Sequence, residues 1–315
     1  MTALRATSTQ TNSDRGGKRR LEPVLEGARD ESVSAHPFLK WAGGKWAIAP
    51  QLTRLLPHDV KARVYREPFL GGGAMFFYMQ PERAFLSDAL HDLVNTYKVV
   101  QASVDALITR LDKLRDAHST EHYYSIRERY NKEREAPRIE RASWLVYLNK
   151  TCFNGLYRTN REGSFNVPEG KFKNPRVCDP DKLRLAAAAL QDAEIKHQTF
   201  DHLLDVAEEG DVIYLDPPYV PLTKTANFAG YTDASFGPVD QERLAKAFRV
   251  LDERGCLLGL SNSDTPFVRD LYRGYDLCPI LAPRAISAKA ATRGDVNELF
   301  VRNLDKYPSG ARSRT

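Results

Sequence analysis

Short apolar runs alternate with amphipathic stretches over most of this chain. The run from Val212 to Leu215 is apolar at every position, which is typical of a buried strand. It stops at a carboxylate followed by two prolines, and proline cannot continue the hydrogen bonding of a sheet. Further strands are predicted at 62–66, 83–87, 194–197, 255–260, 275–281 and 296–302.

Helical periodicity fills the stretches between these strands. Because strands and helices alternate, the pattern predicts an α/β fold with a doubly wound sheet. We expect a catalytic domain at 36–115 and 178–305, interrupted by a helix-and-hairpin recognition domain at 116–177. The polar residues 1–35 predict a disordered tail, and 306–315 a flexible one. Helices are predicted at 46–55, 89–114, 121–150, 181–190, 239–254 and 264–273.

Composition narrows the class of protein. The chain has 315 residues, of which 42% are hydrophobic, enough for a sizeable core. No run of about 18 apolar residues is present, and no secretory segment opens the chain, so we expect a cytoplasmic protein without a membrane span. The widely spaced cysteines form no CxxC pair or His-Cys cluster, which favours free thiols over disulfides or a metal site. These are Cys152, Cys178, Cys256 and Cys278.

The stretch Asp216-Pro217-Pro218-Tyr219 follows the apolar run directly. Open α/β sheets bind ligands at the carboxyl ends of their strands. A carboxylate, a rigid backbone carbonyl at Pro217 and the ring of Tyr219 suit a planar group that bears an NH2. The competing interpretation is an ordinary turn with a surface aromatic.

A glycine turn between a predicted strand and a predicted helix runs from Gly71 to Gly73. This is the nucleotide-binding opening of a doubly wound sheet. A dinucleotide fingerprint would need a third glycine where Phe76 stands, so a nicotinamide cofactor is disfavoured. Asp88 lies 17 residues after Gly71, near the spacing of an acid that binds ribose hydroxyls. Asp88 is equally well placed to cap the following helix.

Two further stretches suggest contacts with anions. Gly43-Gly44-Lys45 opens a predicted helix and forms an anion site, although it lacks the spacing of a phosphate-binding P-loop. Residues 141–176 hold seven Lys or Arg against two Asp or Glu. Within them, 149–173 combine Asn, Arg and aromatic residues in a predicted hairpin, which favours nucleic-acid contact over a glycine-rich connector.

Taken together, these motifs resemble the Dam-type family of DNA adenine-N6 methyltransferases, the α-group or D12 class, from about Phe38 to Asn303. The resemblance implies a Rossmann-like S-adenosylmethionine-dependent methyltransferase fold with an inserted DNA-recognition domain. It implies methyl transfer from S-adenosylmethionine to N6 of a flipped adenine, without a metal. The matching segments, in the order of the family, are 38–45, 67–73, 87–97, 123–131, 154–168, 216–219, Arg284-Ala285-Ile286-Ser287, Arg293 and 297–299.

The resemblance also implies roles for single residues. Asp216, Pro217 and Tyr219 would be catalytic. Lys45 would pair with the methionine carboxylate of the cofactor, and Asp88 with its ribose hydroxyls. The full cofactor set would be Trp41, Lys45, Phe69, Gly71, Gly73, Asp88 and Asp216. DNA would be bound by Lys40, Asn154, Leu156, Arg158 and Pro168, with Lys40 and Arg158 at the base edges.

From these positions we expect a monomer that methylates adenine in duplex DNA at GATC, with a GATATC-like site as the alternative. The sequence leaves open an RNA or protein-amide acceptor, and a DNA-binding protein without catalysis. It also leaves open whether the enzyme is an orphan, a restriction-modification partner or a phage enzyme. One departure stands out: the family commonly has an acid before a Phe ahead of the catalytic strand, whereas this chain has Thr199-Phe200, with Asp201 one place later.

Overall fold

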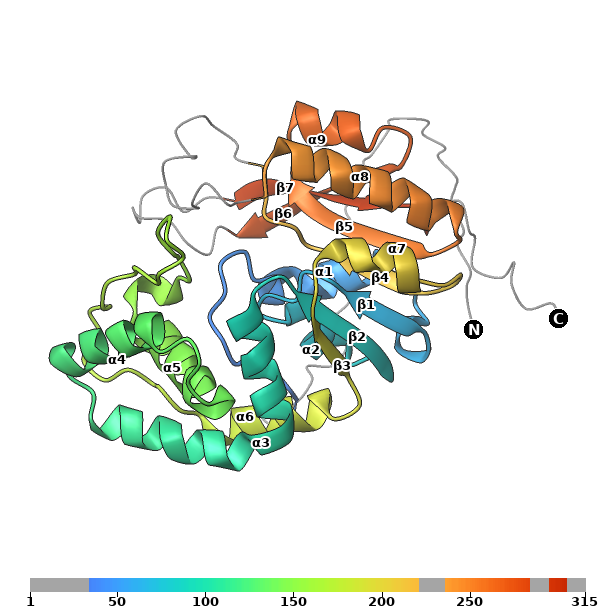
Figure 1. The fold of residues 1–315 in the computed structure, drawn as a ribbon. Coiled ribbons are helices and arrows are strands. Elements are labelled where there is room, and N and C mark those ends of the chain that lie inside the picture. The colour runs from blue at the N-terminus through green and yellow to red at the C-terminus, as the bar shows by residue number, and fades with distance from the viewer. Residues whose placement is uncertain (1–33, 221–235, 284–294, 305–315) are drawn as a thin grey trace, which may run out of the picture. The chain divides into compact units, whose positions relative to one another are not determined.

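The computed structural model describes residues 34–220, 236–283 and 295–304. Residues from Ala35 onward form one compact unit. Its centre is a seven-stranded sheet in the order β3-β2-β1-β4-β5-β7-β6 (Figure 1). Strands β1 to β5 pair in parallel, and β7 runs antiparallel to both β5 and β6. The strands are β1 Val64–Glu67, β2 Arg83–Asp88, β3 Glu194–His197, β4 Val212–Leu215, β5 Leu257–Ser263, β6 Asp276–Pro283 and β7 Asp295–Arg302.

Helices flank this sheet, and the doubly wound α/β fold predicted from the sequence is confirmed. In Figure 1, α8 and α9 lie beside β5 and β7, while α3 lies on the side of β2 and β3. The helices are α1 Ala49–Thr53, α2 Ala74–Met79, α3 His91–Asp116, α4 Thr120–Lys132, α5 Arg138–Thr151, α6 Pro180–Leu190, α7 Leu203–Val206, α8 Pro238–Glu253 and α9 Pro266–Leu271.

Strand β4 shows why the apolar run is buried. Its side chains alternate between two hydrophobic clusters, as the two-residue period of a strand requires. Val212 and Tyr214 pack with residues of β1 and α3, whereas Ile213 and Leu215 pack with residues of α8 and β5. A central strand of this kind holds the residue after it, Asp216, at a fixed point on the edge of the sheet.

The predicted helix at 121–150 is two helices. Lys132 ends α4 and Arg138 begins α5, with Pro137 at the N-cap of α5. The physical reason is that proline disfavours helical backbone in the residue before it. The predicted helix at 46–55 is likewise a 3₁₀ turn at Trp46–Ile48 followed by the short α1.

Helices α4 and α5, within the predicted recognition segment, pack on α3 through a buried ion pair. Arg141 of α5 donates two hydrogen bonds to Asp92 of α3, at 3.0 and 2.5 Å. Tyr130 of α4 donates a third to the same carboxylate at 2.7 Å. Burial acts to raise the pKa of Asp92, but the bonds from Arg141 and Tyr130 outweigh it and lower the pKa. The carboxylate therefore remains charged and joins three helices.

Several sequence predictions fall on other parts of the chain. The predicted tails and the motif residues Arg284 to Ser287 and Arg293 lie outside the described residues. All four cysteines are free thiols, as expected. No helix in the described ranges combines the length and the apolar character needed to cross a membrane.

Candidate active site

Three carboxylates end three neighbouring strands of the sheet. Glu67 is the last residue of β1, Asp88 is the last of β2, and Asp216 follows β4. Because β2, β1 and β4 are adjacent and parallel, their carboxyl ends meet at one edge. The pKa of Glu67 is raised to about 8, mainly by burial and also by the charges of Asp216 and Asp88, while the hydrogen bond from Tyr65 acts to lower it. The sheet therefore brings the predicted residues Asp88 and Asp216 together, with Glu67 between them.

Asp216 meets the lysine of the Gly-Gly-Lys segment. Lys45 Nζ lies 3.0 Å from Asp216 Oδ1 and donates a hydrogen bond to the Gly43 carbonyl at 2.6 Å. The ammonium group also lies 4.6 Å from the ring centroid of Tyr219. Burial raises the pKa of Asp216 to about 6, although Lys45 acts to lower it. Oδ1 is buried, and the Lys45 ammonium group is the partner that the described residues provide for it.

The loop after Asp216 is fixed by polar contacts that the sequence did not predict. Tyr219 donates a hydrogen bond to Glu298 Oε2 at 2.7 Å. Gln241 donates to the Pro218 carbonyl at 2.8 Å, and Asn262 in turn donates to Gln241 Oε1 at 2.9 Å. The polar end of β5, Ser261-Asn262-Ser263, was the available signal, because a buried strand seldom ends in polar side chains without partners.

The glycine turn is built around Asp88 and Trp41. Gly71 has φ +49° and Gly73 has φ +67°, backbone conformations that favour glycine. A Cβ on Gly71 would come within 2.8 Å of Trp41 Cδ1. Asp88 Oδ2 accepts the Gly71 amide at 3.0 Å, and Oδ1 accepts the Leu90 amide at 2.9 Å, just before α3. Asp88 therefore holds the turn and the start of the helix at once.

Phe69 belongs to an aromatic cluster beside this turn. Its ring stacks on Phe200 at 5.7 Å and meets Phe236 edge-on at 5.6 Å. The neighbouring Thr199 hydroxyl donates to Asp201 at 2.9 Å, and Arg243 pairs with the same Asp201 at 3.4 Å. Asp201 is thus engaged on the protein surface, at the position where the family pattern departs.

The predicted DNA-binding hairpin lies next to Trp41, in the segment 38–45. Tyr157 of the hairpin stacks on Trp41, with 5.8 Å between ring centroids. Arg158 donates to Asn166 Oδ1 at 2.7 Å, which fixes its guanidinium group across the hairpin. Asn154 is exposed with φ +56°, in a turn closed by a hydrogen bond from the Phe153 amide to the Pro168 carbonyl. Leu156, half-buried, completes this group.

Lys40 is held against the same hairpin. The Asn149 side chain accepts a hydrogen bond from the Lys40 amide at 2.9 Å and donates one to its carbonyl at 2.7 Å. The Lys40 ammonium group lies 4.6 Å from the ring centroid of Phe172. Within the described ranges, no group of three or more His, Cys, Asp or Glu side chains is arranged so that it could hold a metal ion.

Comparison with known proteins places these observations in a family. Residues 41–286 match the model of the D12 class N6 adenine-specific DNA methyltransferases. The type II methyltransferase M.MjaIII of Methanocaldococcus jannaschii is 40% identical over 288 residues, covering 86% of this chain and all of that protein. The type II methyltransferase M1.LlaDCHI of Lactococcus lactis is 36% identical, covering 86% of this chain and 96% of that protein. The DNA adenine methylase of Escherichia coli K12 is 36% identical, covering 84% and 93%. The resemblance inferred from the motifs is confirmed, and the chain belongs to the D12 class of N6 adenine-specific DNA methyltransferases.

Proposed function

We propose that this methyltransferase modifies the adenine of GATC sites in duplex DNA, with Asp216, Pro217 and Tyr219 acting on the flipped base. Membership of the family makes the reaction a methyl transfer from S-adenosylmethionine to N6 of adenine in DNA. This favours DNA over the RNA and protein-amide acceptors and over a protein without catalysis. The observation that carries the proposal is the buried Asp216 carboxylate at the end of β4, paired with Lys45 and next to Tyr219.

The adenine amine is a poor nucleophile because its lone pair is delocalised into the ring. Asp216 and the Pro217 carbonyl would accept hydrogen bonds from its two N–H groups and aim its lone pair at the methyl group. As the nitrogen–methyl bond forms, the sulfur–methyl bond would break, and the one excess proton would leave the nitrogen by way of Asp216. S-adenosylmethionine, when bound, supplies an electrophilic methyl group. Tyr219, fixed through Glu298, would stack on the base once it leaves the duplex. The chain thus contributes positioning and electrostatic stabilisation, and no covalent enzyme intermediate is required.

The residues around the glycine turn suit S-adenosylmethionine. A carboxylate at Asp88 fits ribose hydroxyls, and the ammonium group of Lys45 fits the methionine carboxylate. Trp41, Phe69, Gly71 and Gly73 would line the rest of the site. The absence of a side chain at Gly71 lets the Trp41 ring lie against the backbone of the turn, which holds Trp41 at the proposed site. Since Lys45 also pairs with Asp216, cofactor binding would draw this charge away and leave Asp216 for the amine.

Base reading is proposed for the hairpin and the neighbouring lysine. An arginine contacts O6 and N7 of guanine in the commonest specific contact, worth about 1–3 kcal/mol of discrimination. The bond from Arg158 to Asn166 supports this role because it fixes the guanidinium before DNA arrives. Lys40 would contact a second base edge. Leu156 and Pro168 would contact a thymine methyl group. The exposed Asn154 would contact the DNA helix where the flipped base has left it.

We further propose that residues 116–177 act as the recognition domain of a catalytic domain at 36–115 and 178–305, in a monomeric enzyme. The test is methylation of short duplexes by the purified protein with labelled S-adenosylmethionine. The expected result is incorporation into a GATC duplex and none into one in which GATC is replaced by GTAC. Incorporation restricted to a GATATC duplex would select the alternative target.

A further inference from the structure

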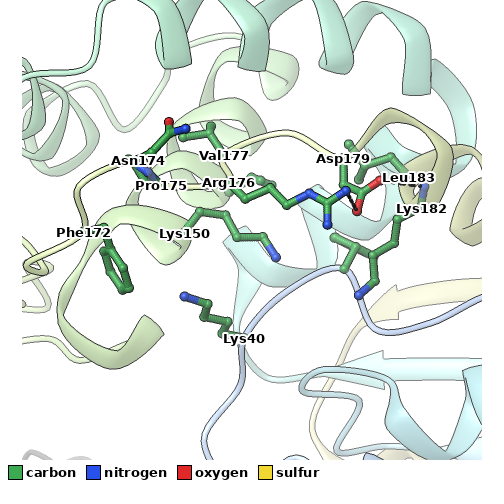
Figure 2. A pocket seen from close by; sticks show the side chains of 12 residues that line it. Lys40, Lys150, Phe172, Asn174, Pro175, Arg176, Val177, Asp179, Lys182 and Leu183 are labelled. Atoms are coloured by element: carbon green, nitrogen blue, oxygen red, sulfur yellow. Dashed lines mark hydrogen bonds and ion pairs between the residues drawn. The ribbon is translucent and has the colours of Figure 1, made fainter.

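A basic pocket lies apart from the carboxylates of the active site. It has a volume of about 250 Å³ and is bounded by the Lys40 segment, the end of α5, the 172–177 segment and the first turn of α6 (Figure 2). Four cationic side chains line it, Lys40, Lys150, Arg176 and Lys182, against the single carboxylate of Asp179. Sequence reasoning singled out the basic character of 141–176 but did not bring Lys150 and Lys182 together.

The one carboxylate in the pocket is already engaged. Arg176 pairs with Asp179 at 3.3 Å, and the other Asp179 oxygen caps α6 by accepting the Lys182 amide at 3.4 Å. In the described part of the chain, no carboxylate lies within ion-pair distance of Lys150 or Lys182. The pocket therefore holds positive charge that the protein itself does not neutralise.

The charge of Lys150 is the least favourably placed in this pocket. Burial lowers the pKa of Lys150 to about 8, and the nearby charges of Lys182, Lys40 and Arg176 add to the effect. A half-buried lysine among like charges is unfavourable unless an anion compensates it. Lys40 is also held in place: Asn149 fixes its backbone, and the Phe172 ring packs against its ammonium group.

We propose that this pocket is a phosphate-binding site outside the catalytic centre. A phosphate group offers compact negative charge, single in the DNA backbone and higher in a free phosphate, and the acceptor oxygens that converging ammonium and guanidinium groups bind. The phosphate is either one of the DNA backbone or that of a free small molecule. Lys40 belongs to both this pocket and the proposed base-reading surface, so with a DNA phosphate the inference deepens the proposed function and rests on it.

The test compares Lys150→Gln and Lys182→Gln with Lys246→Gln, which removes the same charge from an exposed position of α8. Binding of pyrophosphate is measured by calorimetry, and binding of a GATC duplex by fluorescence anisotropy at several salt concentrations. Methylation of the GATC duplex at saturating DNA is measured separately for each variant. Because each substitution only removes an uncompensated charge, all three variants are expected to fold like the parent, which thermal unfolding checks.

A site for the DNA backbone predicts that both pocket variants bind DNA at least fivefold more weakly. Their salt dependence should also be lower by about one unit in the slope of log K against log salt. A site for a free phosphate compound predicts at least tenfold weaker pyrophosphate binding with unchanged DNA affinity. Pyrophosphate and DNA binding both equal to those of Lys246→Gln would overturn the proposal. Failure of the parent to methylate GATC would count against the target assignment alone.

Discussion

At the scale of single residues, the proposed reaction requires Asp216 to be ionised. Its pKa is raised to about 6 by burial, so the acceptor form is lost as pH falls through that value. We expect kcat/KM to rise about tenfold per pH unit below pH 6 and to level off above it. The isosteric Asp216→Asn variant should lose about 10²-fold or more in turnover, since it presents an NH2 group to the amine. Turnover of this variant within tenfold of the parent, with the fold intact, would remove Asp216 from the mechanism.

Glu67 gives a second test at this scale, and its readout is stability. Its pKa is raised to about 8 in the folded protein, mainly by burial, from 4.5. Between these values the folded state binds more protons than the unfolded state, so stability falls as pH rises from about 4.5 to 8. Glu67→Gln removes this contribution and keeps an acceptor for the Tyr65 hydroxyl. Relative to the parent, the variant should gain at least about 1 kcal/mol between pH 5 and pH 8. Urea unfolding at both pH values measures the difference, and an unchanged difference would show that Glu67 ionises normally.

At the scale of secondary-structure elements, α3 and α5 are joined by two ion pairs, one buried and one exposed to solvent. The side chains of Arg141 and Asp92 are 6% and 11% exposed, whereas those of Arg110 and Glu140 are 39% and 28% exposed. Removing Arg141 leaves a buried carboxylate without its partner, at a cost of about 3–5 kcal/mol. Removing Arg110 breaks a solvated pair worth about 1 kcal/mol or less.

Arg141→Ala and Arg110→Ala therefore form a matched pair on the same two helices. Thermal and urea unfolding should show a large loss of stability for the first variant and a small one for the second. Equal losses would mean that the packing of α5 on α3, and not the buried charge, determines the cost.

Strands and helices are the features of this protein that the sequence predicts best. The central strand was found because it is continuously apolar, and Val212–Leu215 is buried at every position. The break between α4 and α5 was missed because periodicity continues on either side of Pro137. Asp88 and Asp216 could be placed at the sheet edge because each comes at the end of a strand that the sequence predicts.

Contacts between distant segments could not be predicted. Tyr219 and Glu298 are separated by 79 residues, and Lys40 and Asn149 by 109. No local pattern specifies such pairs, because they depend on how the sheet brings its strand ends together. The basic pocket is of the same kind: its lysines come from three separate segments of the chain.

At the scale of the whole molecule, the proposed methyl transfer lies at the sheet edge and the proposed base reading lies in the adjoining hairpin. Trp41 links the two, since it packs on the glycine turn and stacks on Tyr157. This arrangement predicts that target sequence and catalysis can be altered separately. A change at Arg158 should affect which adenines are methylated, while a change at Asp216 should affect how fast any adenine is methylated.

The most direct test of the central claim is sequencing of methylated adenines in the genome of cells that lack adenine methylation and express this protein. For the parent, we predict N6-methyladenine at GATC sites. For Arg158→Ala, we predict a relaxed requirement for one guanine, with methylation extending to sites that differ from GATC at that position. Uniformly weaker methylation of unchanged sites by Arg158→Ala would show that Arg158 binds phosphate. Methylated adenines of the parent outside any GAT-containing motif would contradict the account.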